Sequence, residues 1–193
     1  MILAVAVAAG YSAGLLRAQW EKSTWMPPAL SYFWLVPVFF LPQLLAFYLP
    51  GIRNQMANSL ASVFLVISML GFMLFCLLNR KLSGMPVLSI GLLLNLIAIT
   101  ANGGFMPLST DTAADLFPKQ ALATLEIGSR IGVSKDILLS PERIVFPWLV
   151  DRFVPADWFP YQFAFSLGDV FIGIGAFLLL ALSHKPISLP QER

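Results

Sequence analysis

The chain has 193 residues, of which 58% are hydrophobic and only 11% are charged. A soluble domain carries roughly 25% charged residues, so this composition argues against a water-soluble protein and indicates that lipid surrounds most of the chain. The formal net charge of +2 is too small to indicate a nucleic-acid partner. The single cysteine, Cys76, can form neither an internal disulfide nor a C-x-x-C site, and we interpret it as a packing residue.

Five apolar segments predict membrane helices, because a helix needs about 20 mostly apolar residues to cross about 30 Å of hydrocarbon. The first, residues 2–16, ends before Arg17 and has no basic stretch ahead of it, which favours an uncleaved helix with a translocated N-terminus. The second, residues 29–48, contains Pro37 and Pro42, which predict a kink. The third, residues 60–78, is the most uniformly apolar, and the last two are residues 85–100 and 169–182.

These segments divide the chain into three parts. Residues 1–100 hold the first four helices, residues 101–167 form a segment too polar to cross a bilayer, and residues 168–193 hold the fifth helix and a short tail. We therefore predict an all-α membrane protein with about five transmembrane helices and an external segment between helices four and five.

Basic residues in the short loops predict the orientation of the helices, since cytoplasmic loops are enriched in Lys and Arg. Such residues follow the first, third and fifth segments, whereas the loop after the second holds only Arg53. This pattern places the N-terminus outside, the C-terminus in the cytoplasm and residues 101–167 outside. The basic residues then assigned to the cytoplasmic side are Arg17, Lys22, Arg80, Lys81, Lys185 and Arg193.

The external segment has two parts of different character. Apolar residues recur at near-helical spacing between positions 113 and 131, which predicts an amphipathic helix with Pro118 in its first turn. Residues 144–161 are rich in Phe, Trp and Pro, and Pro147, Pro155 and Pro160 exclude a long helix there. We expect this second part to lie in the membrane interface or to cover a neighbouring protein.

Several motifs together resemble a known family. They are Gly14-Leu15-Leu16-Arg17, Asn79-Arg80-Lys81-Leu82, Leu92-Leu93-Leu94-Asn95, Ala101-Asn102-Gly103-Gly104-Phe105-Met106-Pro107, Phe146-Pro147-Trp148-Leu149 and Ser166-Leu167-Gly168-Asp169-Val170. Over nearly its full length the chain resembles an uncharacterised bacterial family of small multi-pass membrane proteins, a domain of unknown function. The resemblance implies a bacterial cytoplasmic (inner) membrane and brings no established activity. A position that is commonly basic in that family is Phe105 here.

One polar cluster is predicted near the outer side of the membrane. Asp169 opens the last apolar helix, and ionisable groups at membrane depth often mark ion or substrate pathways. A carboxylate at a helix N-terminus also serves as a cap, which is the simpler interpretation. In the predicted topology Asn95 and Asn102 lie toward the same side, so the three residues could form a polar cluster that holds the fourth and fifth helices together.

Small residues predict close helix packing. Gly10 and Gly14 form a Gly-x-x-x-Gly pattern in the first helix, and Gly173 and Gly175 lie in the fifth. The same run around Ser12 matches the G-x-S-x-G pattern of hydrolases, but that motif needs a strand-to-helix turn rather than an apolar helix. We therefore interpret these glycines as packing residues.

The composition leaves few options for a cofactor. His184 is the only histidine, which excludes a bis-histidine haem within this chain. A pigment or haem held by His184 alone is an alternative without further support, and an interaction with the C-terminal end of the helix is the simpler interpretation. We predict no metal site, and the identity of any cofactor is unknown.

These residues fit three classes of function to different degrees. A non-catalytic accessory or structural subunit of a larger membrane complex, such as a respiratory or photosynthetic assembly, fits the small-residue faces and the aromatic external segment best. Its partners would be other membrane-protein subunits and lipid. The alternative is a small-solute or ion transporter or channel that uses the polar cluster near Asp169. An enzyme fits least, because no catalytic set of residues lies on one side of the membrane.

Overall fold

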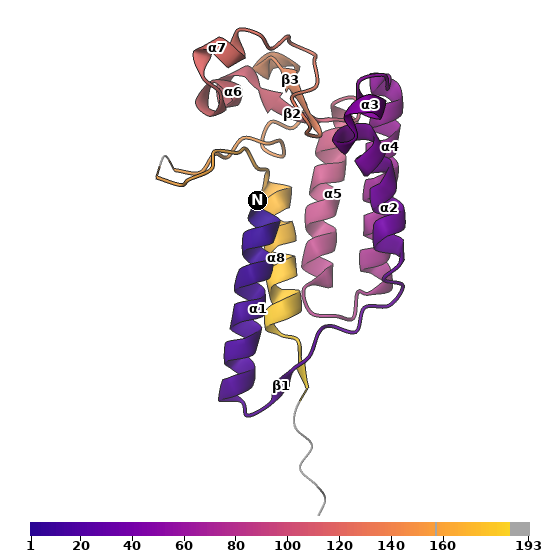
Figure 1. Ribbon diagram of the computed structural model, residues 1–193, viewed down its shortest axis with the longest axis vertical. Helices are drawn as coiled ribbons and strands as arrows, with labels where there is room; N and C mark the ends of the chain where they lie inside the picture. Colours follow the sequence, from indigo (N-terminus) through magenta and orange to yellow (C-terminus); the bar gives the residue numbers. More distant parts are fainter. Residues whose placement is uncertain (157, 186–193) are drawn as a thin grey trace, which may run out of the picture.

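The computed structural model describes residues 1–156 and 158–185, and it is mainly helical (Figure 1). Five apolar helical segments run alternately up and down along the long axis of the molecule. They are α1 (Ile2–Trp20), α2 (Leu35–Gln43) with the π-helix Leu44–Tyr48 that continues it, α4 (Asn58–Leu78), α5 (Met85–Ala101) and α8 (Leu167–Ala181). Of these, α1 and α4 are long and apolar enough to cross a membrane, and the other three are shorter.

The helices pack side by side in an order that differs from the chain order. α1 packs on α8, α8 on α5, α5 on α4, and α4 on α2. The first and last helices of the chain are therefore neighbours, and the N-terminus lies at the same end of the molecule as the start of α8 (Figure 1). The buried residues between α2, α4 and α5 form the main apolar core, which includes Ala61, Leu65, Ala98 and Ile99.

Glycines allow the helices to approach closely. An added Cβ at Gly10 would lie 2.7 Å from the Phe177 backbone oxygen, and one at Gly14 would lie 2.6 Å from the Leu180 oxygen, so both face α8. The two glycines of α8 face different neighbours. Gly173 meets Ile2 of α1, and a Cβ at Gly175 would lie 2.6 Å from the Leu88 nitrogen of α5. The small residues of α8 thus serve two packing faces rather than one.

The second apolar segment starts later and is less regular than the expected helix over 29–48. Residues 29–34 lie outside α2, because the Asn79 side chain accepts from the Ser31 N–H at 2.7 Å and donates to the Ser31 oxygen at 3.0 Å. These bonds use the backbone groups that a helix would pair. Pro42 lies inside α2 and the helix changes to a π-helix at Leu44. Proline lacks the N–H of the helical ladder, so the expected kink takes the form of a change in helix type.

A small cap of short elements covers one end of the helices (Figure 1). β2 (Met106–Ser109) pairs in parallel with β3 (Asp136–Leu139), and the short helices α6 (Thr110–Leu116) and α7 (Lys119–Leu122) lie between them in the chain. A 3-10 helix, Pro141–Arg143, follows β3. The cap has its own apolar core of Leu108, Ala113, Ile131 and Leu138. These strands correct the expectation of a purely helical fold.

The amphipathic helix expected over 113–131 is replaced by two short helices. Phe117 adopts extended angles, φ −112° and ψ 141°, and Pro118 then caps α7. Proline disfavours the helical conformation of the residue before it, and Phe117 adopts an extended one, so the first helix ends at Leu116. Apolar spacing alone did not reveal this break.

Two further contacts position the ends of the molecule. At the cap end, Arg130 donates to the backbone oxygens of Arg53 and Met56, both at 3.1 Å, and Arg53 donates to the Gly132 oxygen. These bonds tie the cap to α3 (Pro50–Arg53) and to the turn before α4. At the opposite end, β1 (Thr24–Trp25) pairs with β4 (His184–Lys185).

Candidate functional site

A hydrogen-bonded cluster joins the start of α8 to the middle of α5. Ser166 and Asp169 form a capping box, in which the Ser166 Oγ accepts from the Asp169 N–H at 3.0 Å and Asp169 Oδ2 accepts from the Ser166 N–H at 3.1 Å. Asn95 completes the cluster, because its Nδ2 donates to Asp169 Oδ1 at 2.9 Å and its Oδ1 accepts from the Ser166 hydroxyl at 2.8 Å. Asp169 is thus a helix cap that also bonds α5.

Asn102 does not belong to this cluster. Its Nδ2 donates to the Ala98 oxygen at 2.7 Å and to the Val145 oxygen at 2.9 Å, while its Oδ1 accepts from the Val145 N–H at 2.8 Å. The side chain therefore attaches the cap segment around Val145 to the end of α5. The predicted cluster of Asn95, Asn102 and Asp169 is therefore corrected. The observed cluster contains Asn95 and Asp169, and its third member is Ser166.

A second set of charged residues from the cap lies next to this cluster. Lys135 precedes β3 and Asp136 begins it, while Asp151 forms a parallel bridge with Leu108 of β2. The Lys135 Nζ lies 3.0 Å from Asp151 Oδ2 and 3.6 Å from Asp136 Oδ1. Sequence reasoning missed this set, because its members come from separate loops and carry no periodic pattern.

Burial and the neighbouring charges shift the pKa values of Asp151 and Lys135. Burial raises the pKa of Asp151 to about 7, although the Lys135 ammonium acts in the opposite direction. For Lys135, burial lowers the pKa, but the attraction of Asp151, Asp136 and Asp169 is stronger and the net shift is upward. Lys135 is therefore charged at neutral pH, whereas Asp151 is partly protonated there.

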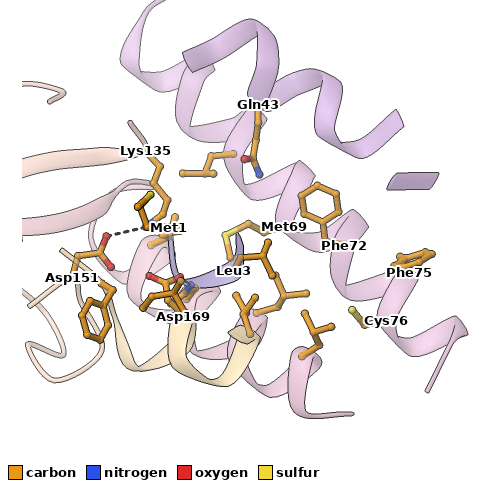
Figure 2. Close-up of a pocket in the computed structure, with 18 of the residues that line it drawn as sticks. Met1, Leu3, Gln43, Met69, Phe72, Phe75, Cys76, Lys135, Asp151 and Asp169 are labelled. Carbon is orange, nitrogen blue, oxygen red and sulfur yellow. Dashed lines mark hydrogen bonds and ion pairs between the residues drawn. The ribbon is translucent and has the colours of Figure 1, made fainter. Parts of the chain in front are cut away.

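These charged residues form one end of a cavity between the helices. The cavity has a volume of about 700 Å³ and is lined by α4, α5 and α8, with contributions from the N-terminal end of α1, from α2 and from the cap. Figure 2 shows Lys135 and Asp151 at one end, Met69 near the middle, and Phe75 and Cys76 at the other end. A volume of this size lies within the range of about 300–1,000 Å³ that is typical of small-molecule sites.

Gln43 brings a further polar group to this cavity. It lies on α2, at the last position before the π-helix, and its side chain points into the cavity (Figure 2). Gln43 is the polar residue at the end of an otherwise apolar run, Leu35–Gln43. This isolated polar position was the signal in the sequence that could have revealed its place in the cavity. The cavity is therefore apolar over most of its length and polar toward the cap.

The other predicted site residues are placed as follows. Gly10, Gly14, Gly173 and Gly175 lie at the helix contacts described above and do not line the cavity. Cys76 is buried in α4 and lines the cavity. The backbone of His184 pairs with Trp25. Within residues 1–156 and 158–185, no group of His, Cys, Asp and Glu is arranged to hold a metal ion.

Fold and site together define a helical protein with two helices of membrane-spanning length and an interhelical cavity that is charged at one end. The chain belongs to DUF5317, a family of unknown function, which matches residues 29–181. The matched range includes α2 to α8. The expected membership of an uncharacterised family is thereby confirmed. No curated protein and no solved structure matches the chain.

Proposed function

We propose that all five long helical segments cross a bilayer and that the chain is a multi-pass protein of a bacterial cytoplasmic membrane. Large apolar side chains are exposed along the helices, among them Leu3 and Leu70, which are 50% and 52% exposed. In water such surfaces would be unfavourable, whereas lipid accommodates them. The shorter α8, about 23 Å at 1.5 Å per residue, needs flanking apolar residues or local thinning to span the hydrocarbon.

The positions of exposed aromatic side chains support a membrane–water boundary near each end of the helices. Trp20, Phe33 and Trp34 are exposed near one end of the helices, and Trp148, Trp158 and Tyr161 are exposed toward the cap. Tryptophan and tyrosine favour the headgroup zone because each has an apolar ring and a polar atom. We infer that the cap and the N-terminus lie outside. The C-terminal end of α1 and the turn between α4 and α5 lie at the opposite end of the molecule (Figure 1), and they carry the basic residues Arg17, Arg80 and Lys81.

Within this membrane protein we propose a non-catalytic role as an accessory or structural subunit of a larger complex. The observation that carries this role is the exposed aromatic segment that connects the cap to α8. Trp158 is 83% exposed and Tyr161 is 63% exposed. Aromatic residues are enriched in the buried centres of protein interfaces, where they supply large contact areas. A subunit of an energy-transducing respiratory or photosynthetic assembly is one setting that fits.

Isolation from native membranes in a mild detergent tests the accessory role. We expect a stoichiometric partner to co-purify with the full chain. Trp158→Ser combined with Tyr161→Ser should reduce the recovered partner, whereas Trp20→Ser at the opposite end of the molecule should not. A protein that elutes alone at its own mass, with no partner in any mild detergent, would contradict this role.

A transporter or channel is the second candidate, because Asp169 lines the cavity. Within the described chain, however, both carboxylate oxygens of Asp169 accept hydrogen bonds from Asn95 and Ser166, which favours the structural role. Solute or proton flux in proteoliposomes that is lost on Asp169→Asn, with the fold intact, would favour transport instead.

A further inference from the structure

The polar end of the cavity has more negative than positive side-chain charge. Asp136, Asp151 and Asp169 line it, and Lys135 is the one cationic side chain among the described residues that do. Lys135 forms its short contact with Asp151 and a longer one with Asp136. Met1 also lines this end of the cavity, and its N-terminal ammonium adds a second positive charge. Two ammonium groups still face three aspartates, so a further positive group would be stabilised there and would favour the charged form of Asp151.

Asp151 has an oxygen that is free to bind such a group. The residue is 3% exposed, and its Oδ2 pairs with Lys135. Its Oδ1 is buried and has no hydrogen-bond partner in the described part of the chain. Buried carboxylate oxygens are normally paired, and an unpaired one is unfavourable. A hydrogen-bond donor inside the cavity would satisfy this oxygen.

Apart from Gln43 and Asn95, most of the rest of the cavity is apolar. Leu65 and Met69 of α4, Leu88 and Leu92 of α5, and Ile172 of α8 line it below the charged end. None of these side chains offers a hydrogen bond, so this part of the cavity favours a hydrocarbon chain. A charged end followed by an apolar length matches an amphiphile better than a small polar solute.

We propose that the cavity binds an amphiphile from the surrounding membrane, with an amine headgroup at Asp151 and a hydrocarbon tail between α4, α5 and α8. An ammonium group supplies both the positive charge and the donor that Asp151 Oδ1 lacks. A carboxylate headgroup would be repelled by the three aspartates, and an alcohol would supply the donor without the charge. This inference rests on the membrane setting proposed above.

A headgroup series on the unmodified protein tests the inference. The full chain, purified in detergent and freed of lipid, is titrated with dodecylamine, dodecanol and dodecanoic acid, and binding is followed by native mass spectrometry. We expect saturable, one-to-one binding of dodecylamine. Dodecanol and dodecanoic acid should each bind at least about tenfold more weakly than dodecylamine. Equal binding of the three compounds, or preference for the acid, would overturn the proposal.

Two pairs of variants locate the site. Asp151→Asn should weaken dodecylamine binding about tenfold or more, whereas Asp115→Asn, at an exposed position on α6, should leave it unchanged. Met69→Trp should block the tail by filling the cavity, whereas Leu70→Trp on the exposed side of α4 should not. Binding that persists in both Asp151→Asn and Met69→Trp would overturn the proposed site. If either variant fails to fold, the headgroup series still decides the outcome.

Cell fractionation separates a failure of this inference from a failure of the membrane setting. A chain that stays in the membrane fraction but does not select the amine contradicts the ligand alone. A chain that is recovered in the aqueous fraction without detergent contradicts the proposed function as well.

Discussion

A few polar side chains hold this largely apolar molecule in one arrangement. Ser166, Asp169 and Asn95 bond each other across two helices, and Asn102 bonds the cap to α5. Asn79 fixes the turn before α2 through Ser31. In an apolar environment a hydrogen bond that is lost cannot be replaced by one to water. Each of these hydrogen bonds therefore contributes more to stability than it would at a water-exposed position.

Ser166→Ala should destabilise the protein by about 1–2 kcal/mol, because the Asp169 N–H loses its cap and Asn95 Oδ1 loses a donor. Thermal unfolding in detergent measures the effect. Ser12→Ala is the matched control, since the Ser12 residue is exposed and, among the described residues, its hydroxyl bonds the Ala8 oxygen of its own helix. The control should change stability by less than about 0.5 kcal/mol. Equal effects of the two substitutions would contradict the role of the cap.

Asp151→Asn should have an effect that depends on pH. The native pKa of Asp151, about 7, lies above the ordinary value of about 3.9 for the unfolded chain, so the native state holds an extra proton between these values. The stability that Asp151 contributes is therefore greatest at low pH and falls as the pH rises through this window. Unfolding of both proteins from pH 4 to 8 should show the stability of the wild type relative to the variant decreasing with pH. A relative stability that increases with pH would contradict the raised pKa.

At the scale of the elements, close contacts between glycines and neighbouring backbones set the helix order. α8 lies between α1 and α5, and its glycines face both of them. Such contacts depend on the absence of a Cβ, since there is little hydrophobic drive between helices in lipid. The same contacts bring Asp169 beside Asn95 and thereby place the polar end of the cavity.

Gly10→Ala should weaken the packing of α1 on α8, because the new Cβ would lie 2.7 Å from the Phe177 oxygen. We expect a loss of roughly 1–3 kcal/mol in unfolding experiments in detergent. Gly51→Ala is the control, since a Cβ at Gly51 meets no atom of residues 1–156 or 158–185 within 4 Å. The control should be neutral or slightly stabilising, because alanine favours the helix. A neutral Gly10→Ala would show that α1 does not depend on this contact.

The sequence predicted helices better than it predicted their interruptions. The bounds of α4 and α5 lie within two residues of the expected segments, because long apolar runs leave few alternatives. The predicted start of the second helix was wrong, because the backbone before α2 is bonded by Asn79, which is distant in the sequence. The prediction of one continuous helix over 113–131 was wrong, because Phe117, which precedes a proline, is extended and ends the first helix. Lys135 and Asp151 could not be predicted as a pair, since only the parallel strands bring their loops together.

At the scale of the whole molecule, the helices, the cap and the two aromatic zones are consistent with the proposed membrane setting. Charged side chains gather at the ends of the helices, and the exposed surfaces between them are apolar. The cavity lies among these helices with its charged end formed by residues of the cap, so a ligand that reaches it from lipid would place its headgroup at that end. Both the accessory role and the amine-binding cavity depend on this arrangement in a bilayer.

Labelling of single cysteines in intact cells tests the membrane arrangement most directly. In a Cys76→Ala background, Glu142→Cys lies on the exposed cap and Lys81→Cys lies in the exposed turn between α4 and α5. A membrane-impermeant maleimide should label Glu142→Cys in intact cells and Lys81→Cys only after the membrane is permeabilised. Equal labelling of both positions in intact cells would place the cap and this turn on the same side and would contradict the five-span topology.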